Sequence, residues 1–178
     1  MIANWELNKF ETNYKVKKSK FFQIFWYFIN AVIFKTPYFP INKIKIQFLR
    51  FFGAKIGQGC IIKPSVNIKY AWELILGDSV WIGENVWIDN LAPVSINSNS
   101  CLSQGVTLIT GTHDFTSTYF ETITKPIQIG SNVWIGAKST IGPGVEICDS
   151  VIISMGATIT TSIETEGIYQ INGPRRVY

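Results

Sequence analysis

From residue 56 onward, an aliphatic residue stands at nearly every sixth position of the chain. A small or branched residue often follows it by four positions, and glycine often follows it directly. Gaps of eight residues after Ile68 and Ile88, and one of 21 after Leu108, interrupt this spacing. The aliphatic positions are Ile56, Ile62, Ile68, Leu76, Ile82, Ile88, Ile96, Leu102, Leu108, Ile129, Ile135, Ile141, Ile147, Ile153 and Ile159.

A period of six fits neither an amphipathic helix nor a simple alternating strand. It predicts an all-β solenoid whose coils each contain three short parallel strands, with the aliphatic residue and the residue four positions later pointing inward. Glycine after the aliphatic residue is expected to let the backbone turn at the corners. Fifteen aliphatic positions at three per coil predict five coils.

Residues 1–55 lack this period. The apolar run 21–34 predicts a helix, and it is shorter than the roughly 20 apolar residues that span a bilayer. One interpretation is a cap that covers the open strand edges of the first coil. The other is an interfacial helix on an anionic membrane, because lysines flank the run. The cap is favoured, and both roles are compatible. The predicted divisions are a basic, aromatic arm and cap (1–55), a β-helix with an extruded loop at 109–128 (56–165), and a C-terminal tail (166–178).

Composition narrows the possible functions. Of 178 residues, 47% are apolar and 16% charged, which is sufficient for a buried core. Residues 1–55 hold ten Lys/Arg and two Asp/Glu (net +8), whereas residues 56–178 hold six and ten (net −4). A nucleic-acid reader would carry its basic stripe on the folded body, so no nucleic-acid partner is expected.

The cysteines and the chain start bear on the compartment. Three widely separated cysteines support neither a disulfide framework nor a zinc ribbon. The start of the chain lacks a basic segment leading into an apolar run, so no signal peptide is expected. A cytoplasmic protein is predicted, located at the inner face of the membrane if the arm binds lipid.

The sole histidine, His113, lies in the longest interruption of the repeat. Long loops in compact proteins are usually functional, although an incidental surface histidine is the alternative. The stretches 82–94, 111–115 and 51–57 resemble the hexapeptide-repeat acyltransferases, in the branch typified by colanic acid biosynthesis acetyltransferases. The resemblance implies a left-handed parallel β-helix. It also implies a homotrimer with active sites between subunits, acetyl-CoA as donor, and no metal. The implied reaction is O-acetylation of a sugar hydroxyl of a surface polysaccharide or its precursor.

The resemblance also suggests roles for individual residues. His113 is the expected general base, because an imidazole can take the hydroxyl proton as the oxygen attacks the thioester. Asp114 and Asp89 are both candidates to orient its ring. The expected acceptor contacts are Asp89, Asn90, Tyr119 and Glu121. The expected coenzyme contacts are Trp134, Gly136, Ala137, Met155, Gly156, Ala157, Thr160, Arg175 and Arg176.

The sequence departs from the family near its end, and two other functions stay open. Relatives carry a Thr-Lys pair where this chain has Thr160 and Thr161, so one phosphate contact is missing and Arg175 and Arg176 remain as phosphate partners. An N-acetyltransferase acting on an amino sugar or an antibiotic would use the same fold and base. A non-enzymatic β-helix scaffold would leave His113 dispensable. The γ-type carbonic anhydrases of this fold need three histidines for zinc, which the chain lacks.

Overall fold

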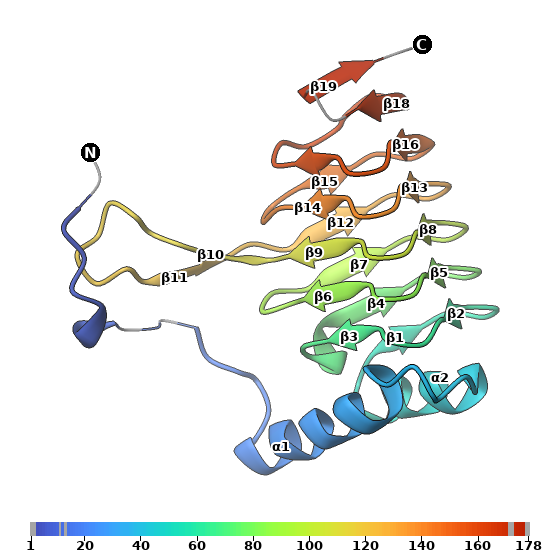
Figure 1. The fold of residues 1–178 in the computed structure, drawn as a ribbon, viewed down its shortest axis with the longest axis horizontal. Helices are drawn as coiled ribbons and strands as arrows, with labels where there is room; N and C mark the ends of the chain where they lie inside the picture. The colour runs from blue at the N-terminus through green and yellow to red at the C-terminus, as the bar shows by residue number, and fades with distance from the viewer. Residues whose placement is uncertain (1–2, 11, 13, 171–172, 177–178) are drawn as a thin grey trace.

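The computed structural model describes residues 3–10, 12, 14–170 and 173–176, with the side chains of 173–176 outside the described part. Figure 1 shows a column of stacked coils, with two helices at one end and a hairpin extending from one side. The column is a left-handed parallel β-helix, as predicted. Five coils of three strands are complete, and β18 continues the column into a sixth.

The strands of the column form three sheets, one on each face, and strands of successive coils pair in parallel. The first face contains β1 (Lys55–Ile56), β4 (Leu74–Leu76), β7 (Val94–Ile96), β12 (Ile127–Ile129) and β15 (Glu146–Ile147). The second contains β2 (Ile61–Ile62), β5 (Trp81–Ile82), β8 (Cys101–Leu102), β13 (Trp134–Ile135), β16 (Val151–Ile153), β18 (Gly167–Gln170) and β19 (Gly173–Arg176). The third contains β3 (Asn67–Ile68), β6 (Trp87–Asp89), β9 (Thr107–Ile109), β14 (Thr140–Ile141) and β17 (Thr158–Ile159).

The six-residue repeat is the interior of the column. Every repeated aliphatic residue from Ile62 to Ile159 is buried, and so are most of the residues four positions later, such as Val80 and Val133. The strand register stacks equivalent positions on one another: on the second face, Ile62 pairs with Ile82 and Ile82 with Leu102. Burying one branched side chain contributes about 1.5–3 kcal/mol, so this stack is the main source of stability.

The role expected for the repeated glycines was wrong. The corner residue with positive φ stands three positions after the aliphatic one, for example Ser79 (φ 56°) and Gly105 (φ 70°). Glycine directly after the aliphatic residue lies where the next coil approaches closely. A Cβ on Gly77 would lie 2.6 Å from the backbone nitrogen of Ser98, and one on Gly83 would lie 2.7 Å from that of Gln104. These glycines therefore allow close coil stacking, and other residues make the turn.

The N-terminal arm supplies the helical cap. Helix α1 (Lys20–Ile29) continues as a π-helical turn, η2 (Asn30–Phe34), and α2 (Asn42–Phe51) follows. Two short 3-10 turns, η1 (Leu7–Lys9) and η3 (Ala71–Glu73), lie before α1 and in the first gap of the repeat. The helix predicted over residues 21–34 is therefore present, whereas α2 was not predicted separately. Trp26, Phe34 and Phe52 lie in the core, with ring centroids 5.1–5.3 Å apart where Trp26 meets the other two.

Side chains of the cap bind the open backbone edge of the first coil on all three faces. On the first face, Arg50 donates to the carbonyls of Ile56 and Gly57. On the second, Asn42 donates to the Cys60 carbonyl and accepts from the Ile62 amide, both at 2.8 Å. The buried Lys45 ammonium donates to the Lys63 carbonyl at 2.9 Å, and desolvation lowers its pKa. On the third, the Trp26 indole donates to the carbonyls of Ile68 and Lys69.

The C-terminal tail, expected as a separate segment, continues the second face. β18 pairs in parallel with β16, and β19 pairs antiparallel with β18. Within the described residues, no helix is both long and apolar enough to cross a membrane.

Replacing Asn42 tests the cap. Asn42→Ala removes two hydrogen bonds and leaves a carbonyl and an amide of the first coil without their partner. We expect the free energy of unfolding to fall by about 2 kcal/mol. Chemical denaturation measures the change, and Gln47→Ala, which truncates an exposed side chain of the same helix, is the control. Equal stability of the two variants would contradict this role for Asn42.

Candidate active site

The longest interruption of the repeat forms a β-hairpin. β10 (Gly111–His113) pairs antiparallel with β11 (Thr122–Thr124), and His113 lies opposite Thr122. The hairpin leaves the third face after β9 and returns to the first face at β12. It projects sideways from the column (Figure 1). The insertion therefore carries His113 away from the coils on a structure with its own backbone pairing.

Phe120 holds the imidazole of His113 in two ways. Its carbonyl oxygen lies 2.9 Å from Nδ1, and its ring is stacked on the imidazole with centroids 4.3 Å apart and planes within 7°. A carbonyl only accepts hydrogen bonds, so Nδ1 carries the proton of the neutral ring and Nε2 keeps its lone pair. Phe120 has φ of 51°, a conformation that is uncommon for a non-glycine residue and is often found at functional sites.

The start of the chain packs on the hairpin, which was not predicted. The Ala3 amide and the Trp5 indole both donate to the Phe115 carbonyl at 3.1 Å. The Trp5 ring lies 4.7 Å from the Phe120 ring, and the Phe10 ring meets the imidazole edge-on at 5.8 Å. The imidazole is thus held between aromatic rings from two distant parts of the sequence. This contact could not be predicted, because Trp5 and Phe10 are isolated aromatic residues outside the repeat.

The structure places Asp114 away from the imidazole. Its carboxylate accepts from the hydroxyl of Thr116 at 2.6 Å and from the Thr116 amide at 2.9 Å. These bonds, the hydroxyl bond above all, lower the pKa of Asp114. The carboxylate closes a local turn, and a backbone carbonyl has the ring-orienting position expected for Asp114 or Asp89.

The residues expected to contact the acceptor lie in three places: the core, the hairpin and the surface of the coils. Asn90 is fully buried, and its amide both accepts from and donates to the backbone of Tyr70, so its expected contact with the acceptor is corrected to a structural role between coils. Tyr119 is exposed near the tip of the hairpin. Glu121 has a buried carboxylate oxygen, Oε2, with no hydrogen-bond partner in the described part of the chain. Asp89 lies on the coils.

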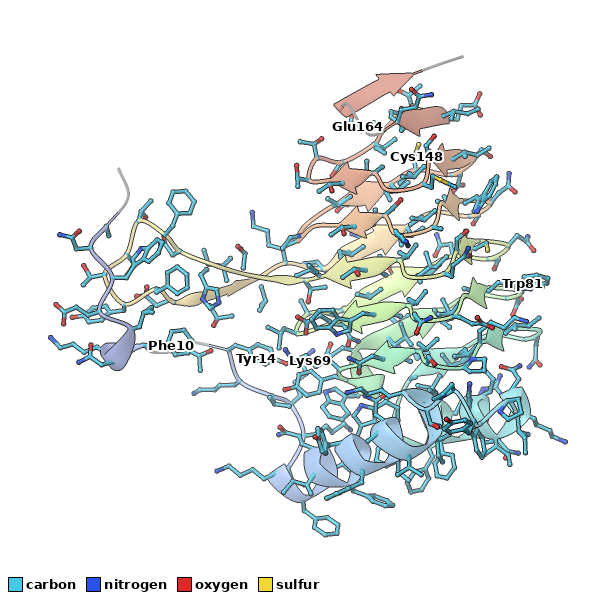
Figure 2. All side chains as sticks on the ribbon, viewed as in Figure 1. Phe10, Tyr14, Lys69, Trp81, Cys148 and Glu164 are labelled. Carbon is cyan, nitrogen blue, oxygen red and sulfur yellow. The ribbon has the colours of Figure 1, made fainter. Side chains whose placement is uncertain are left out.

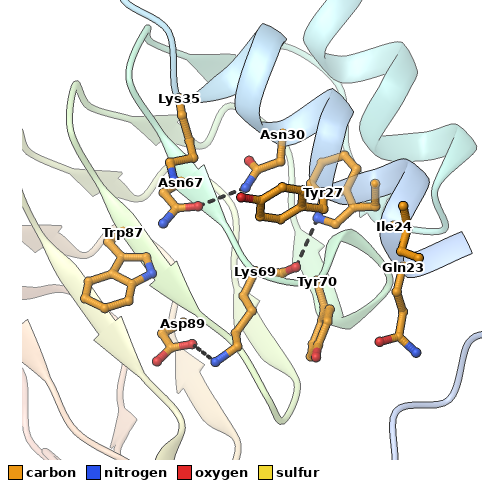
Figure 3. A pocket seen from close by; sticks show the side chains of 11 residues that line it. Gln23, Ile24, Tyr27, Asn30, Lys35, Asn67, Lys69, Tyr70, Trp87 and Asp89 are labelled. Carbon is orange, nitrogen blue, oxygen red and sulfur yellow. Dashed lines mark hydrogen bonds and ion pairs between the residues drawn. The ribbon is translucent and has the colours of Figure 1, made fainter. Parts of the chain in front are cut away.

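Asp89 lines a cavity of about 470 Å³ between α1 and the third face. Figure 3 shows its carboxylate directed at the ammonium of Lys69, 2.8 Å away, with Trp87 and Tyr70 nearby. The backbone carbonyl of Asp89 accepts hydrogen bonds from the amide and hydroxyl of Thr110, the residue before the hairpin. The cavity therefore lies one coil from the base of the hairpin. The exposed aromatic ring of Trp87, beside a carboxylate and an ammonium, suits a polar ligand with many hydroxyls.

The residues expected to contact the coenzyme lie mainly at the corner after the second face. The exposed Trp134 donates to the Ser103 hydroxyl at 2.9 Å, and the Gly156 amide donates to the Ala137 carbonyl. Met155 and Thr160 are exposed, whereas Gly136 is buried. Ala157 is fully buried with its amide and carbonyl both bonded, so a direct contact between it and a ligand is corrected to a core role. The side chains of Arg175 and Arg176 lie outside the described residues.

One copy of the chain does not bring His113 and the residues expected to contact the coenzyme together. Trp134 and Met155 belong to the second face and its corner, while the hairpin leaves the third face. In Figure 1 the hairpin extends from the side of the column opposite β8, β13 and β16.

Other reactive groups are less suited to chemistry. Cys60, Cys101 and Cys148 are free thiols, and desolvation raises the pKa of each, which disfavours the nucleophilic thiolate. Among the described residues, no three His, Cys, Asp or Glu side chains are grouped as metal ligands would be.

Three comparisons place the chain among known proteins. Residues 126–161 match the family model "Bacterial transferase hexapeptide (six repeats)". The chain is 36% identical over 138 residues to the Escherichia coli (strain K12) protein named "Putative colanic acid biosynthesis acetyltransferase WcaF", covering 78% of this chain and 76% of the relative. A hexapeptide-repeat acetyltransferase from Vibrio cholerae has a similar structure, with a TM-score of 0.76 at 19% identity over 91% of this chain and 93% of that one.

A galactoside acetyltransferase in complex with coenzyme A also has a similar structure, with a TM-score of 0.73 at 21% identity. That match covers 87% of this chain and 80% of the other. At these identities the two solved structures show a common fold, and the sequence relative shows common descent. The coils, the hairpin and the comparisons agree, and the chain belongs to the hexapeptide-repeat acetyltransferase family.

Proposed function

We propose that this acetyltransferase moves an acetyl group directly from acetyl-CoA to a sugar hydroxyl of a surface polysaccharide or its precursor, with His113 as general base. The observation that carries the proposal is the imidazole, whose Nδ1 is bound by the Phe120 carbonyl while Nε2 is left to accept a proton. The related fold of a galactoside acetyltransferase with bound coenzyme A supports the donor, and the named role of the Escherichia coli relative supports the acceptor class.

The reaction needs one base and no protein nucleophile. The proton of the sugar hydroxyl moves to Nε2 as the hydroxyl oxygen bonds to the thioester carbon. The carbon–sulfur bond then breaks, and the proton passes from Nε2 to the departing thiolate. The Phe120 carbonyl accepts from Nδ1 throughout, so its dipole favours the imidazolium that forms between the two proton transfers. Raised thiol pKa values are consistent with a route that uses no cysteine.

The cavity between α1 and the third face is the proposed acceptor site. Trp87 presents aromatic surface to a sugar ring, and Asp89 and Lys69 offer an acceptor and a donor for its hydroxyls. Its position one coil from the base of the hairpin supports this assignment.

A homotrimer completes the proposed site. His113 and the residues assigned to the coenzyme lie on opposite sides of one column, so a neighbouring copy must supply one of the two groups. A closed cyclic arrangement is the usual solution, and three copies suit a three-sided column.

The decisive test is His113→Ala. We expect release of the coenzyme A thiol in the presence of neutral and amino sugars to fall by about 10²–10⁴-fold, the usual contribution of a general base. Calorimetry should show unchanged binding of acetyl-CoA, and sedimentation should show the same trimer. An unchanged rate would refute the base. Transfer to amino sugars alone would replace O-acetylation by N-acetylation, and wild-type protein that does not bind acetyl-CoA would favour a scaffold.

Phe120→Ala tests how the base is positioned. The variant keeps the backbone carbonyl and loses the ring stacked on the imidazole, so we expect kcat to fall by about tenfold or more because the base is less well oriented. The KM for acetyl-CoA should not change. The control is Phe115→Ala, which removes an exposed ring from the same hairpin. Equal kcat values in the two variants would show that the stack does not position His113.

Trp87→Ala tests the acceptor cavity. Losing one aromatic face should raise the KM for the saccharide by about tenfold, since such a contact contributes about 1.4 kcal/mol, and leave the KM for acetyl-CoA unchanged. Trp81→Ala is the matched control, because Trp81 has the equivalent strand position on the second face, outside the cavity. A larger change in saccharide KM for Trp81→Ala than for Trp87→Ala would place the acceptor elsewhere.

A further inference from the structure

Helix α1 and its continuation η2 have two apolar faces, of which the coils contact only one. Phe22, Trp26 and Ile29 point inward and pack against the core. A second stripe, spaced three or four residues apart, stays exposed, although an amphipathic helix that covers a core normally presents polar residues there. It consists of Phe21 (80% exposed), Ile24 (56%), Phe25 (43%), Phe28 (59%) and Val32 (67%).

The exposed stripe continues onto α2. A shallow groove of about 360 Å³ is lined by Phe25 of α1 and by Gln47, Phe48 and Phe51 of α2, and Phe51 is 70% exposed. We call the five exposed residues of the stripe and Phe51 the outer face. Figure 2 shows side chains, several of them aromatic, projecting from the helices on the side turned away from the coils. Contiguous exposed apolar surface of this kind marks an interaction site.

The charged residues of the segment that forms the outer face are all basic. Residues 14–55 contain nine Lys/Arg and no Asp/Glu. Lys45 is buried. The other basic residues are exposed, and one of them, Lys17, pairs with the buried Glu73. Exposed basic residues at the start of α1 and around α2 are Lys15, Lys18, Lys20, Lys43 and Arg50. A basic margin around exposed aromatic residues complements an anionic surface that has an apolar interior.

We propose that the outer face docks the enzyme on an anionic lipid bilayer. The helices form one end of the column, so a plane can contact them without meeting the coils (Figure 1). The aromatic side chains would enter the boundary between headgroups and acyl chains while the lysines pair with lipid phosphates. A helical stripe of this kind binds in the plane of the interface and does not need to cross the membrane.

The docking surface adjoins the cavity proposed for the acceptor. Ile24 belongs to the outer face and also lines that cavity, together with Gln23 and Tyr27 of the same helix. A docked enzyme would therefore hold the cavity close to the headgroups, where a saccharide attached to a lipid would lie. This last step rests on the proposed function, whereas the docking itself does not.

Vesicle binding without substrate tests the docking separately from catalysis. The full-length protein is sedimented with vesicles of phosphatidylcholine alone or mixed with phosphatidylglycerol. We expect binding to the mixed vesicles that weakens when salt screens the lysines. Phe21→Asn combined with Phe28→Asn should weaken it by about tenfold or more, because two aromatic contacts are lost. Trp81→Asn, at an exposed aromatic residue of the coils, should bind as the wild type does.

Each outcome decides the proposal. Both replaced residues are exposed, so thermal unfolding should match the wild type and show that the double variant is folded. Absence of wild-type binding to mixed vesicles, or equal binding by the double variant, would overturn the docking. Self-association of the wild type that disappears in the double variant, with no vesicle binding by either, would instead assign the outer face to a second copy of this chain.

Discussion

Pairing of each coil with the next is the constraint on which the rest of the structure depends. A parallel coil cannot satisfy its backbone or bury its aliphatic residues alone, and the first coil has no neighbour below it. The cap replaces that neighbour with side chains: Arg50, Asn42 and Trp26 bind the backbone on the three faces that another coil would have paired. Lys45 has the same role, because its buried ammonium group donates to a backbone carbonyl of the first coil even though burial removes it from water.

A regular column of this kind leaves little room for a reactive group. Most inward positions are filled by aliphatic side chains, and the corners are packed against the next coil. The hairpin avoids this restriction because it leaves the register and returns to it, so its sequence is free to hold an imidazole. Its conformation is stabilised by its own strand pairing and by aromatic contacts with the start of the chain.

The repeat made the fold predictable, because coil stacking imposes the same requirement at each sixth residue. Its longest interruption located His113 for the same reason. The partner of the imidazole could not be predicted, since it is a backbone carbonyl, which every residue has. Asn90 is a polar residue beside Asp89 in the sequence, yet it lies in the core and binds Tyr70 one coil away. The repeated glycines indicated positions where a side chain does not fit. The sequence did not show whether the cause was a backbone turn or the close approach of the next coil.

The contact between Trp5 and Phe120 joins positions separated by most of the chain. A ribosome makes the tryptophan near the beginning and the phenylalanine only after three coils have been synthesised. The column can grow coil by coil from its cap, with each step requiring only local loops to close. The hairpin cannot receive its aromatic partner until that growth has passed residue 120, so the environment of the histidine forms only after the cap and the first three coils have been made.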